Sequence, residues 1–291
     1  MRGAVCGVLL LDKPVGLSSN AALQRVRRLL GADKAGHVGS LDPLATGMLP
    51  ICLGEATKVA GEILSGRKCY RFTIQLGART ATGDTEGEVV ETASVPALDR
   101  AHVEARLSGF VGPQDQIPPM YSAIKSGGQP LYKLARSGVE VERAPRRIEI
   151  FQLTLSGLDG SSLQLEALCS KGTYIRTLSE DVARALGTCG HVTALRRPYI
   201  EPFDQEPMET LETVASAPEG LRILPPDRPL GHLPAVSLSS ADTVRLLHGQ
   251  AVAGGLVPGT VRLYGGGGEF LGIGEADGQG TVRPRRLFVS R

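Results

Sequence analysis

The order of strand and helix patterns limits the fold of this chain more than any other feature. Residues 68–76 alternate between apolar and polar side chains, as a half-buried strand does, and strand patterns return at 148–155 and 163–169. Helix patterns fall at 98–107 and 178–186, so a helix does not follow every strand. Because this order favours hairpins over parallel crossovers, we expect an α+β fold rather than a doubly wound α/β fold.

The N-terminal region combines one strand pattern, one helix pattern and a long irregular stretch. Residues 5–11 read as a short buried strand. The polar run 18–20 offers N-cap residues for a helix that ends at Gly31, a residue type favoured just past a helix end. Between residues 32 and 54 the periodicity is lost and glycine, proline and histidine accumulate, which indicates a shaped loop.

Two further segments and a change in composition suggest the domain organisation. Residues 83–87 indicate a tight turn into a partner strand at 88–90, and segment 113–145 is typical of a protruding, partly mobile insertion. The last 60 residues hold 12 of the 37 glycines, six arginines and no lysine. We therefore expect a large domain over residues 1–230 and a small β-rich domain over residues 231–291.

Composition excludes several classes of protein. The chain has 291 residues, 42% of them hydrophobic, but no apolar run near the roughly 18 residues that span a bilayer and no cleavable leader pattern. Five widely spaced cysteines without a C-x-x-C pair favour neither disulfides nor a metal site. We expect a cytoplasmic monomer. The net charge is only +2, yet basic residues cluster at 25–34, 67–71, 143–147, 196–197 and 283–286, as a phosphate-binding groove needs.

The most unusual segment surrounds Asp42. Residues 35–47 contain three glycines, one proline, one histidine and this single carboxylate, which indicates special backbone conformations. The pattern is not a phosphate-binding P-loop, and His37 has no second histidine near it in sequence. Two interpretations stay open: Asp42 is catalytic, or it forms a hydrogen bond to the following backbone in a turn.

A second dense segment, residues 169–177, lies at a junction of strand and helix. Arg176 can pair with a buried carboxylate, and Tyr174 can present its ring or hydroxyl to a pocket. Alternatively, Arg176 is a solvated cation and Tyr174 a core aromatic residue. Tyr70, on the apolar face of its strand, has the same two interpretations.

Several motifs occur together in an order that covers nearly the whole chain. As a set they resemble the bacterial TruB family of tRNA pseudouridine synthases. The motifs are Gly7 to Pro14, Gly36 to Gly47, Leu53 to Lys58, Tyr70 to Phe72, Met120 to Lys125, Ser170 to Arg176 and Pro284 to Leu287.

The resemblance implies a fold, a reaction and a partner. The fold is that of a pseudouridine synthase, with a mixed, largely antiparallel central sheet flanked by helices and a small C-terminal PUA-like domain that binds RNA. The reaction converts uridine 55 in the T-loop of tRNA to pseudouridine, after the nucleotide is flipped out of the loop. The partner is the T-stem-loop of tRNA. An intramolecular rearrangement needs no metal and no small-molecule cofactor.

The resemblance also implies a role for individual residues. Asp42 matches the catalytic aspartate, and Arg176 matches the arginine paired with it. Tyr174 matches an active-site tyrosine, which either accepts a proton as a general base or only orients the nucleobase. The substrate-binding positions are His37, which enters the T-loop, Tyr70, which stacks on the target base, Tyr174, and Leu195, which lines the base pocket.

Two other functions remain as alternatives. A non-catalytic RNA-binding or tRNA-folding protein would use the basic clusters and leave Asp42 structural. A nucleoside or glycoside hydrolase would use Asp42 chemically, but such enzymes usually need a second carboxylate or a metal ion nearby.

Overall fold

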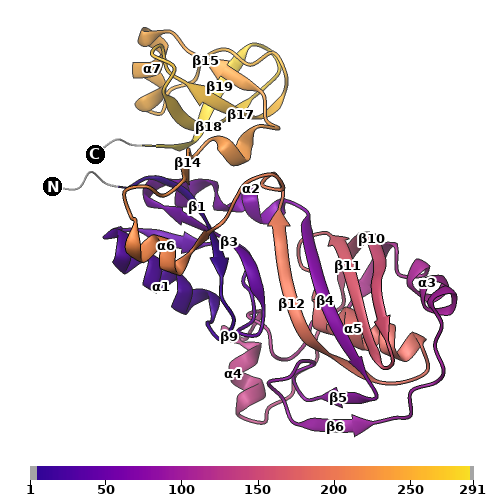
Figure 1. Cartoon of the computed structure of the whole chain (residues 1–291). Coiled ribbons are helices and arrows are strands. Elements are labelled where there is room, and N and C mark those ends of the chain that lie inside the picture. Colours follow the sequence, from indigo (N-terminus) through magenta and orange to yellow (C-terminus); the bar gives the residue numbers. More distant parts are fainter. Residues whose placement is uncertain (1–4, 289–291) are drawn as a thin grey trace.

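The computed structural model describes residues 5–288 and contains two large sheets, each with its own core, and two small two-stranded sheets (Figure 1). The larger sheet has ten strands in the order β13-β1-β3-β12-β4-β11-β10-β7, with β14 paired to β1 and β2 paired to β3. Its strands are β1 (Gly7–Lys13), β2 (Ala35–His37), β3 (Thr46–Leu53), β4 (Lys68–Leu76), β7 (Gly112–Gln116), β10 (Arg146–Asp159), β11 (Ser162–Cys169), β12 (Gly190–Ile200), β13 (Glu209–Thr210) and β14 (Ile223–Leu224).

Among the described strands, the β1–β13 and β3–β12 pairs of this sheet are parallel and the others are antiparallel. The α+β fold with a mixed, largely antiparallel sheet is therefore confirmed. The helices are α1 (Ser19–Leu30), α2 (Ala60–Ser65), α3 (Arg100–Ser108), α4 (Leu131–Arg136), α5 (Ile175–Ala185), α6 (Leu211–Ser216) and α7 (Ser240–Leu247), with 3-10 turns η1 (Gly54–Val59) and η2 (Arg228–Leu230).

Helix α1 has the ends that the sequence predicts. The Ser18 side chain accepts a hydrogen bond from the Ala21 nitrogen, and Gly31 adopts a left-handed φ of 61° at the other end. Ala22, Val26 and Leu30 of this helix are buried. The predicted turn at 83–87 is also present, since it joins β5 (Ala78–Thr80) to β6 (Val89–Thr92).

The prediction of a loop over residues 32–54 is wrong in part. Only the middle of this stretch is a loop, because β2 precedes it and β3 follows it. Strand β3 lies inside the sheet, and all of its residues except Thr46 are buried. A strand that is covered on both faces has no apolar and polar alternation, which is why the pattern did not reveal it.

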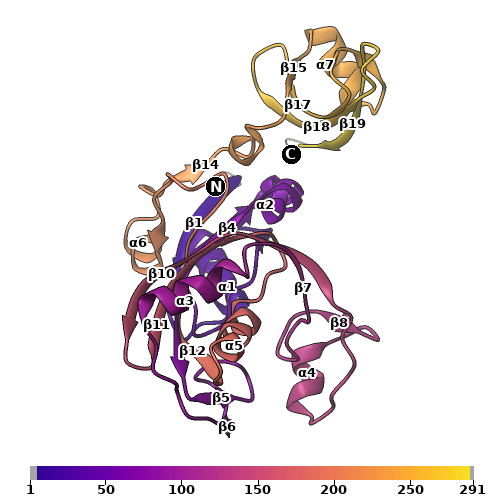
Figure 2. The ribbon, with the colours of Figure 1, turned by 90° about the vertical axis from the view of Figure 1, so that its right-hand side faces the viewer.

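Two other elements differ from the sequence expectation. The first residues of the 113–145 segment belong to the sheet, because Gly112–Gln116 forms its edge strand β7. The part that projects contains β8 (Lys125–Ser126), β9 (Gln129–Pro130) and α4, and Figure 2 shows β8 and α4 standing away from the sheet. Strand β12 is not among the predicted strands, although it lies at the centre of the sheet.

The main core lies between one face of the sheet and helices α1, α3 and α5. Tyr70, Phe72 and Ile74 of β4 point to this face, together with Leu178 of α5. A smaller cluster on the other face includes Val8 and Leu10 of β1, and Ile63 of α2. The catalytic loop predicted around Asp42 therefore lies in a frame that is packed on both sides.

The second sheet forms the C-terminal part, at one end of the molecule (Figure 1). Its order is β15-β17-β18-β19-β16, with strands β15 (Ala235–Ser237), β16 (Val252–Ala253), β17 (Gly259–Tyr264), β18 (Phe270–Ala276) and β19 (Thr281–Leu287). Val59, Leu230 and Ile273 form a small cluster between the two parts, and Arg286 Nη1 donates to the Lys58 carbonyl at 2.6 Å.

The predicted domain boundary at residue 230 falls between β14 and β15 and stays a prediction. The first four residues of the predicted large domain and the last three of the small one lie outside the described residues. Within residues 5–288, none of the helices has the length and apolar character required to cross a membrane.

Candidate active site

Asp42 lies in the loop between β2 and β3, and the backbone of this loop is fixed from two sides. The Ser19 hydroxyl accepts a hydrogen bond from the Leu41 nitrogen at 2.7 Å and donates to the Leu41 carbonyl at 2.9 Å. Gly47 has a φ of 98°, and a Cβ atom there would lie 2.3 Å from the Arg197 carbonyl oxygen. The glycine pattern therefore reflects a close backbone approach that fixes where Asp42 is presented.

The Asp42 carboxylate binds the guanidinium group of Arg176, at the start of α5. Arg176 Nε lies 2.9 Å from Asp42 Oδ2, and Nη2 donates to Oδ1 at 3.3 Å. The same guanidinium donates to the carbonyls of Thr82 at 2.8 Å and Tyr121 at 2.7 Å, and it lies 3.7 Å from Asp84 Oδ2. The described contacts of the Asp42 side chain are with this guanidinium, and none is with the backbone nitrogens that follow Asp42.

Opposing effects act on the protonation of Asp42. Burial raises the pKa of its carboxyl group, and the Arg176 charge beside it is the main opposing effect. Nearby Asp84 raises this pKa further, and Lys13 lowers it. The Asp42 side chain is 39% exposed, so part of it can be reached from solvent.

Tyr174 directly precedes α5 and stands two residues before Arg176. Its backbone nitrogen donates to Gln116 Oε1 at 2.8 Å, and its carbonyl accepts from Gln116 Nε2 at 3.1 Å. The Tyr174 side chain is half-buried, and burial raises the pKa of its hydroxyl. A raised pKa makes the phenol a weaker acid and leaves little phenolate near neutral pH.

Tyr70 is buried on the helix-covered face of β4 and contacts a fully buried cation. Arg197 Nη1 donates to the Tyr70 hydroxyl at 3.4 Å, and the guanidinium carbon lies 5.9 Å from the ring centroid. Arg197 also donates to the carbonyls of Gly39 at 2.6 Å and Met48 at 2.8 Å. Arg197 thus joins Tyr70 to the loop that carries Asp42.

The other two predicted positions lie around this centre. His37 ends β2 opposite Ile51, its Nδ1 atom is buried without a hydrogen-bond partner, and burial lowers its pKa. Leu195 pairs with Phe72 in the sheet, is 8% exposed and points to the same face as Tyr70. No contact between Leu195 and Asp42 is described.

The structure brings Asp42 and Arg176 into contact, as the sequence predicts, and adds residues that sequence reasoning missed. Lys13 is completely buried and donates to the carbonyls of Pro14 at 2.9 Å and Leu17 at 2.6 Å. Arg197 and Gln116 are the other two. Arg197 could have been noticed as part of a basic pair, but nothing in the sequence marks Gln116 as special.

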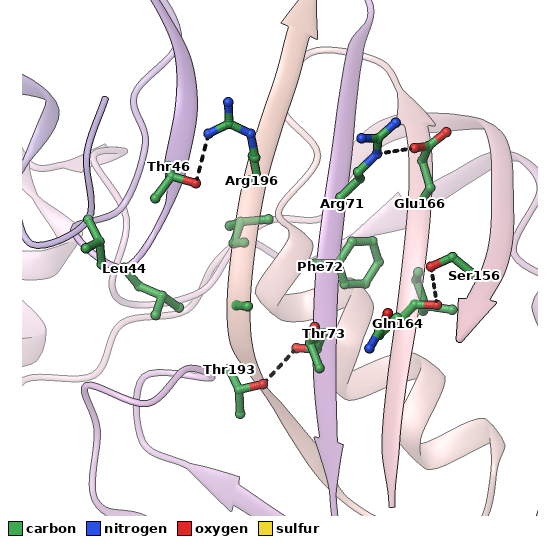
Figure 3. A pocket seen from close by; sticks show the side chains of 14 residues that line it. Leu44, Thr46, Arg71, Phe72, Thr73, Ser156, Gln164, Glu166, Thr193 and Arg196 are labelled. Carbon is green, nitrogen blue, oxygen red and sulfur yellow. Dashed lines mark hydrogen bonds and ion pairs between the residues drawn. The ribbon is translucent and has the colours of Figure 1, made fainter. Parts of the chain in front are cut away.

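A cavity opens over the sheet, and the predicted site residue Leu195 is among the residues that line it, together with Leu44 and Thr46 at the start of β3. It measures about 460 Å³, and Figure 3 shows side chains of β4, β11 and β12 around it. Arg71 and Glu166 form an ion pair there at 2.6 Å, on residues that alternate with those facing the core. Across residues 5–288, no three His, Cys, Asp or Glu side chains gather as a metal site would require.

Comparison with known proteins gives three family matches. Residues 27–175 match the model of the N-terminal domain of the TruB family of pseudouridylate synthases. Residues 176–222 match a C-terminal domain model of tRNA pseudouridylate synthase B, and residues 234–288 match the C-terminal model of pseudouridine synthase II TruB. The matches therefore extend over both sheets.

Relatives with curated names match along nearly their whole length. A tRNA pseudouridine synthase B of Chromohalobacter salexigens is 50% identical, over 97% of this chain and 94% of the relative. One from Stutzerimonas stutzeri is 50% identical over 100% of this chain and 98% of the relative.

Solved structures share the fold at lower sequence identity. An H/ACA ribonucleoprotein bound to a substrate RNA containing 2′-deoxyuridine matches with a TM-score of 0.74 and 22% identity, over 98% of this chain and 86% of that chain. A Cbf5–Nop10–Gar1 complex matches with a TM-score of 0.72 and 24% identity, over 98% and 84%.

Proposed function

Because the chain belongs to the TruB family of pseudouridine synthases, we propose that it converts uridine 55 in the T-loop of tRNA to pseudouridine, with Asp42 as the attacking carboxylate. The protein is an isomerase, and its family and relatives are tRNA pseudouridine synthases. The observation that supports Asp42 is its two-point contact with the buried guanidinium of Arg176.

The reaction moves one bond and leaves the composition of the nucleotide unchanged. The bond between N1 of uracil and C1′ of ribose breaks, the base turns, and a bond forms between C5 and C1′. The C5 proton is lost and N1 gains a proton, so no redox partner or group donor is consumed. Asp42 attacks C1′ or C6 of uracil, or assists elimination to a glycal, and each of these routes needs an ionised carboxylate.

The Asp42–Arg176 pair meets that requirement. Burial alone would favour the protonated acid, and the adjacent guanidinium favours the carboxylate. The 39% exposure of the Asp42 side chain leaves room for a nucleotide to approach. Arg176 is itself fixed by two carbonyl oxygens, so the attacking oxygen is held in position before the substrate arrives.

The neighbouring residues bind the flipped nucleotide in this proposal. Extruding a base costs a few kcal/mol, and stacking on an aromatic ring returns about 1 to 3 kcal/mol. Tyr70 provides that ring, and Leu195 lies on the same face of the sheet. His37 enters the T-loop in place of the extruded base. Tyr174 orients the base rather than removing its C5 proton, since burial raises its pKa.

The test uses an unmodified T-stem-loop RNA with or without the single uridine. The wild-type protein is expected to form pseudouridine only when that uridine is present, which mass-neutral product analysis or release of tritium from C5 records. Asp42→Asn should bind the RNA with affinity close to that of the wild type and form no product. Pseudouridine formation by Asp42→Asn would contradict the proposal.

The same assay separates the two alternatives. A non-catalytic RNA-binding protein would bind the stem-loop and give no product even as the wild type. A hydrolase would release free uracil. Asp84, 3.7 Å from Arg176 Nε, is the second carboxylate nearest to such chemistry, but it is only 2% exposed and its Oδ1 is occupied by Thr82 and the Glu86 nitrogen.

A further inference from the structure

Gln116 makes an unusual contact with the active-site helix. It is the last residue of the edge strand β7, at the foot of the projecting segment, and is 5% exposed. Its carboxamide binds both polar groups of one backbone residue, accepting from the Tyr174 nitrogen at 2.8 Å and donating to the Tyr174 carbonyl at 3.1 Å. Both ends of the Gln116 side chain are therefore committed to Tyr174.

This contact replaces a missing helix cap. Tyr174 occupies the N-cap position of α5, but its side chain makes no capping hydrogen bond, and the first turn contains no acidic residue. The nitrogens at the start of a helix have no partners within the helix, so an outside acceptor stabilises that end. Gln116 is such an acceptor, 58 residues away in sequence.

A second contact joins the same segment to the catalytic ion pair. Tyr121, five residues after Gln116, accepts a hydrogen bond from Arg176 Nη2 at 2.7 Å through its carbonyl. Arg176 Nη2 is also the group that donates to Asp42 Oδ1 at 3.3 Å. Residues 116–121 thus contact the start of α5 twice, once at its backbone and once at its guanidinium.

We propose that Gln116 is a positioning residue for the isomerisation, because its two hydrogen bonds to the Tyr174 backbone set where Arg176 meets Asp42. The inference rests on the proposed function of Asp42. Gln116 does not touch the substrate; it acts through the first turn of α5.

The expected effect is on the chemical step rather than on binding. Displacing a catalytic group by about 1 Å costs roughly 100-fold in rate. Without the two hydrogen bonds from Gln116, Arg176 would hold the Asp42 carboxylate less well. Burial and Asp84, which raise the pKa of Asp42, would then have the larger effect on it. The groups that act on Asp42 or are influenced by it are Arg176, Asp84, Lys13, Glu86, Tyr70 and Tyr174.

The experiment compares Gln116→Met, which keeps the length but removes both hydrogen bonds, with the wild type. The single-turnover rate on the T-stem-loop RNA should fall about 10- to 100-fold, with RNA affinity within about threefold. The acid side of its pH profile should move to higher pH. Gln116→Glu keeps an acceptor for the Tyr174 nitrogen, so its rate should lie between those of Gln116→Met and the wild type.

Gln114→Leu is the matched control, because Gln114 lies on the same strand and binds only the nearby Phe110 carbonyl among its described contacts. It should keep the wild-type rate and pH profile. A Gln116→Met protein with the wild-type rate and pH profile would overturn the inference. A fall in rate that is fully explained by a lower melting temperature would also overturn the inference, since Gln116 would then act only as a structural helix cap.

Asp42→Asn, measured in parallel, separates this inference from the proposed function. Product formation by Asp42→Asn would remove the proposed nucleophile, whatever Gln116 does. If Asp42→Asn is inactive while Gln116→Met has the wild-type rate and pH profile, Asp42 remains the proposed nucleophile and only the positioning role of Gln116 is rejected.

Discussion

Three buried cations of the large sheet, besides Arg176, form their described hydrogen bonds without a carboxylate. Arg197 and Lys13 are completely buried, and Lys68 is 4% exposed. Their described hydrogen bonds go to backbone carbonyls or, for Arg197, also to a tyrosine hydroxyl. Burial lowers the pKa of both lysines to about 8. Of these cations, Lys13 acts on Asp42 and lowers the pKa of its carboxyl group, which favours the carboxylate.

The first prediction concerns Lys13→Met. Lys13 lowers the pKa of Asp42, so removing its charge should raise that pKa and move the acid side of the pH profile of kcat to higher pH. The two profiles should converge above pH 8, where Lys13 itself loses its proton. Single-turnover rates on the T-stem-loop RNA between pH 5 and 9 measure this.

Lys68→Met is the control for Lys13→Met. It removes a buried lysine with a similar pKa of about 8, but Lys68 is not among the groups that act on Asp42. Its profile should match that of the wild type on the acid side. An equal displacement in both variants would show that loss of a buried cation perturbs the fold rather than Asp42.

The second prediction concerns Tyr174→Phe. Because burial raises the pKa of the Tyr174 hydroxyl and so leaves little phenolate near neutral pH, we expect this group to orient the nucleobase rather than to accept its proton. The variant should still form pseudouridine, within about tenfold of the wild-type rate, since a lost general base typically costs 100-fold or more. Accumulation of free uracil without pseudouridine would instead identify Tyr174 as the base.

The site could be predicted from the sequence where its residues stand in dense motifs. Asp42 and Arg176 lie in such motifs, and their contact is observed. Gln116 escaped prediction because a glutamine in an edge strand has no pattern of its own. Its importance arises only when folding brings it to Tyr174. The assigned roles of His37, Tyr70 and Leu195 remain predictions.

At the scale of elements, the contact between β3 and β12 positions the loop that carries Asp42. These strands pair in parallel over two residue pairs, Thr46 with Arg196 and Gly47 with Arg197. This is the shortest strand pairing in the centre of the sheet. The loop carrying Asp42 ends where this pairing begins. The position of Asp42 therefore depends on how closely the two backbones approach at Gly47.

The third prediction concerns Gly47→Ala. The new Cβ would lie 2.3 Å from the Arg197 carbonyl oxygen, and the φ of 98° is strained for any residue with a side chain. We expect both a lower free energy of unfolding in urea and a lower rate of pseudouridine formation. Gly31→Ala is the control, because its φ is 61° but no atom lies within 4 Å of its Cβ.

Gly31→Ala should cost only the backbone term of about 1 to 2 kcal/mol and leave the rate unchanged. If Gly47→Ala lost no more stability than Gly31→Ala and kept full activity, the close approach would not matter for the site.

Prediction of the elements succeeded where local signals were strong. Helix α1 has an apolar stripe, a serine cap and a glycine end, all of which act within a few residues. Strands β3 and β12 were missed because their form is decided by neighbours distant in sequence. Strand β12 even contains Arg197, which is charged and yet completely buried. Such a residue contradicts the usual pattern of a central strand.

At the scale of the molecule, basic side chains occur on both sheets although the net charge is only +2. Arg283 and Arg285 are exposed on β19 of the C-terminal part. We expect this part to bind tRNA through phosphate contacts, as the sequence predicts. Affinity from such contacts falls as salt concentration rises.

The fourth prediction concerns the double variant Arg283→Gln and Arg285→Gln. It should weaken tRNA binding and flatten the dependence of log K on log salt, by about one to two units for two lost phosphate contacts. The rate at saturating tRNA should not change, because neither residue is near Asp42 in the proposed site. Binding titrations between 50 and 300 mM salt measure the slope.

Arg245→Gln is the comparison for that double variant, since Arg245 on α7 pairs with Asp242 at 3.2 Å, whereas the contact of Arg285 with Glu275 is longer, at 3.9 Å. Its slope should equal that of the wild type. An unchanged slope in the double variant would mean that the C-terminal part does not bind phosphates through β19.

Arg176 has partners from three distant stretches of the chain. Its contacts with Asp42, Thr82 and Tyr121 span 134, 94 and 55 residues. During synthesis, Asp42 leaves the ribosome long before Arg176 does. A nascent or truncated chain that ends before residue 176 has an acid without its counter-charge, so it cannot modify RNA. The ability to catalyse the reaction thus requires that translation has passed residue 176 and that the long-range contacts have formed.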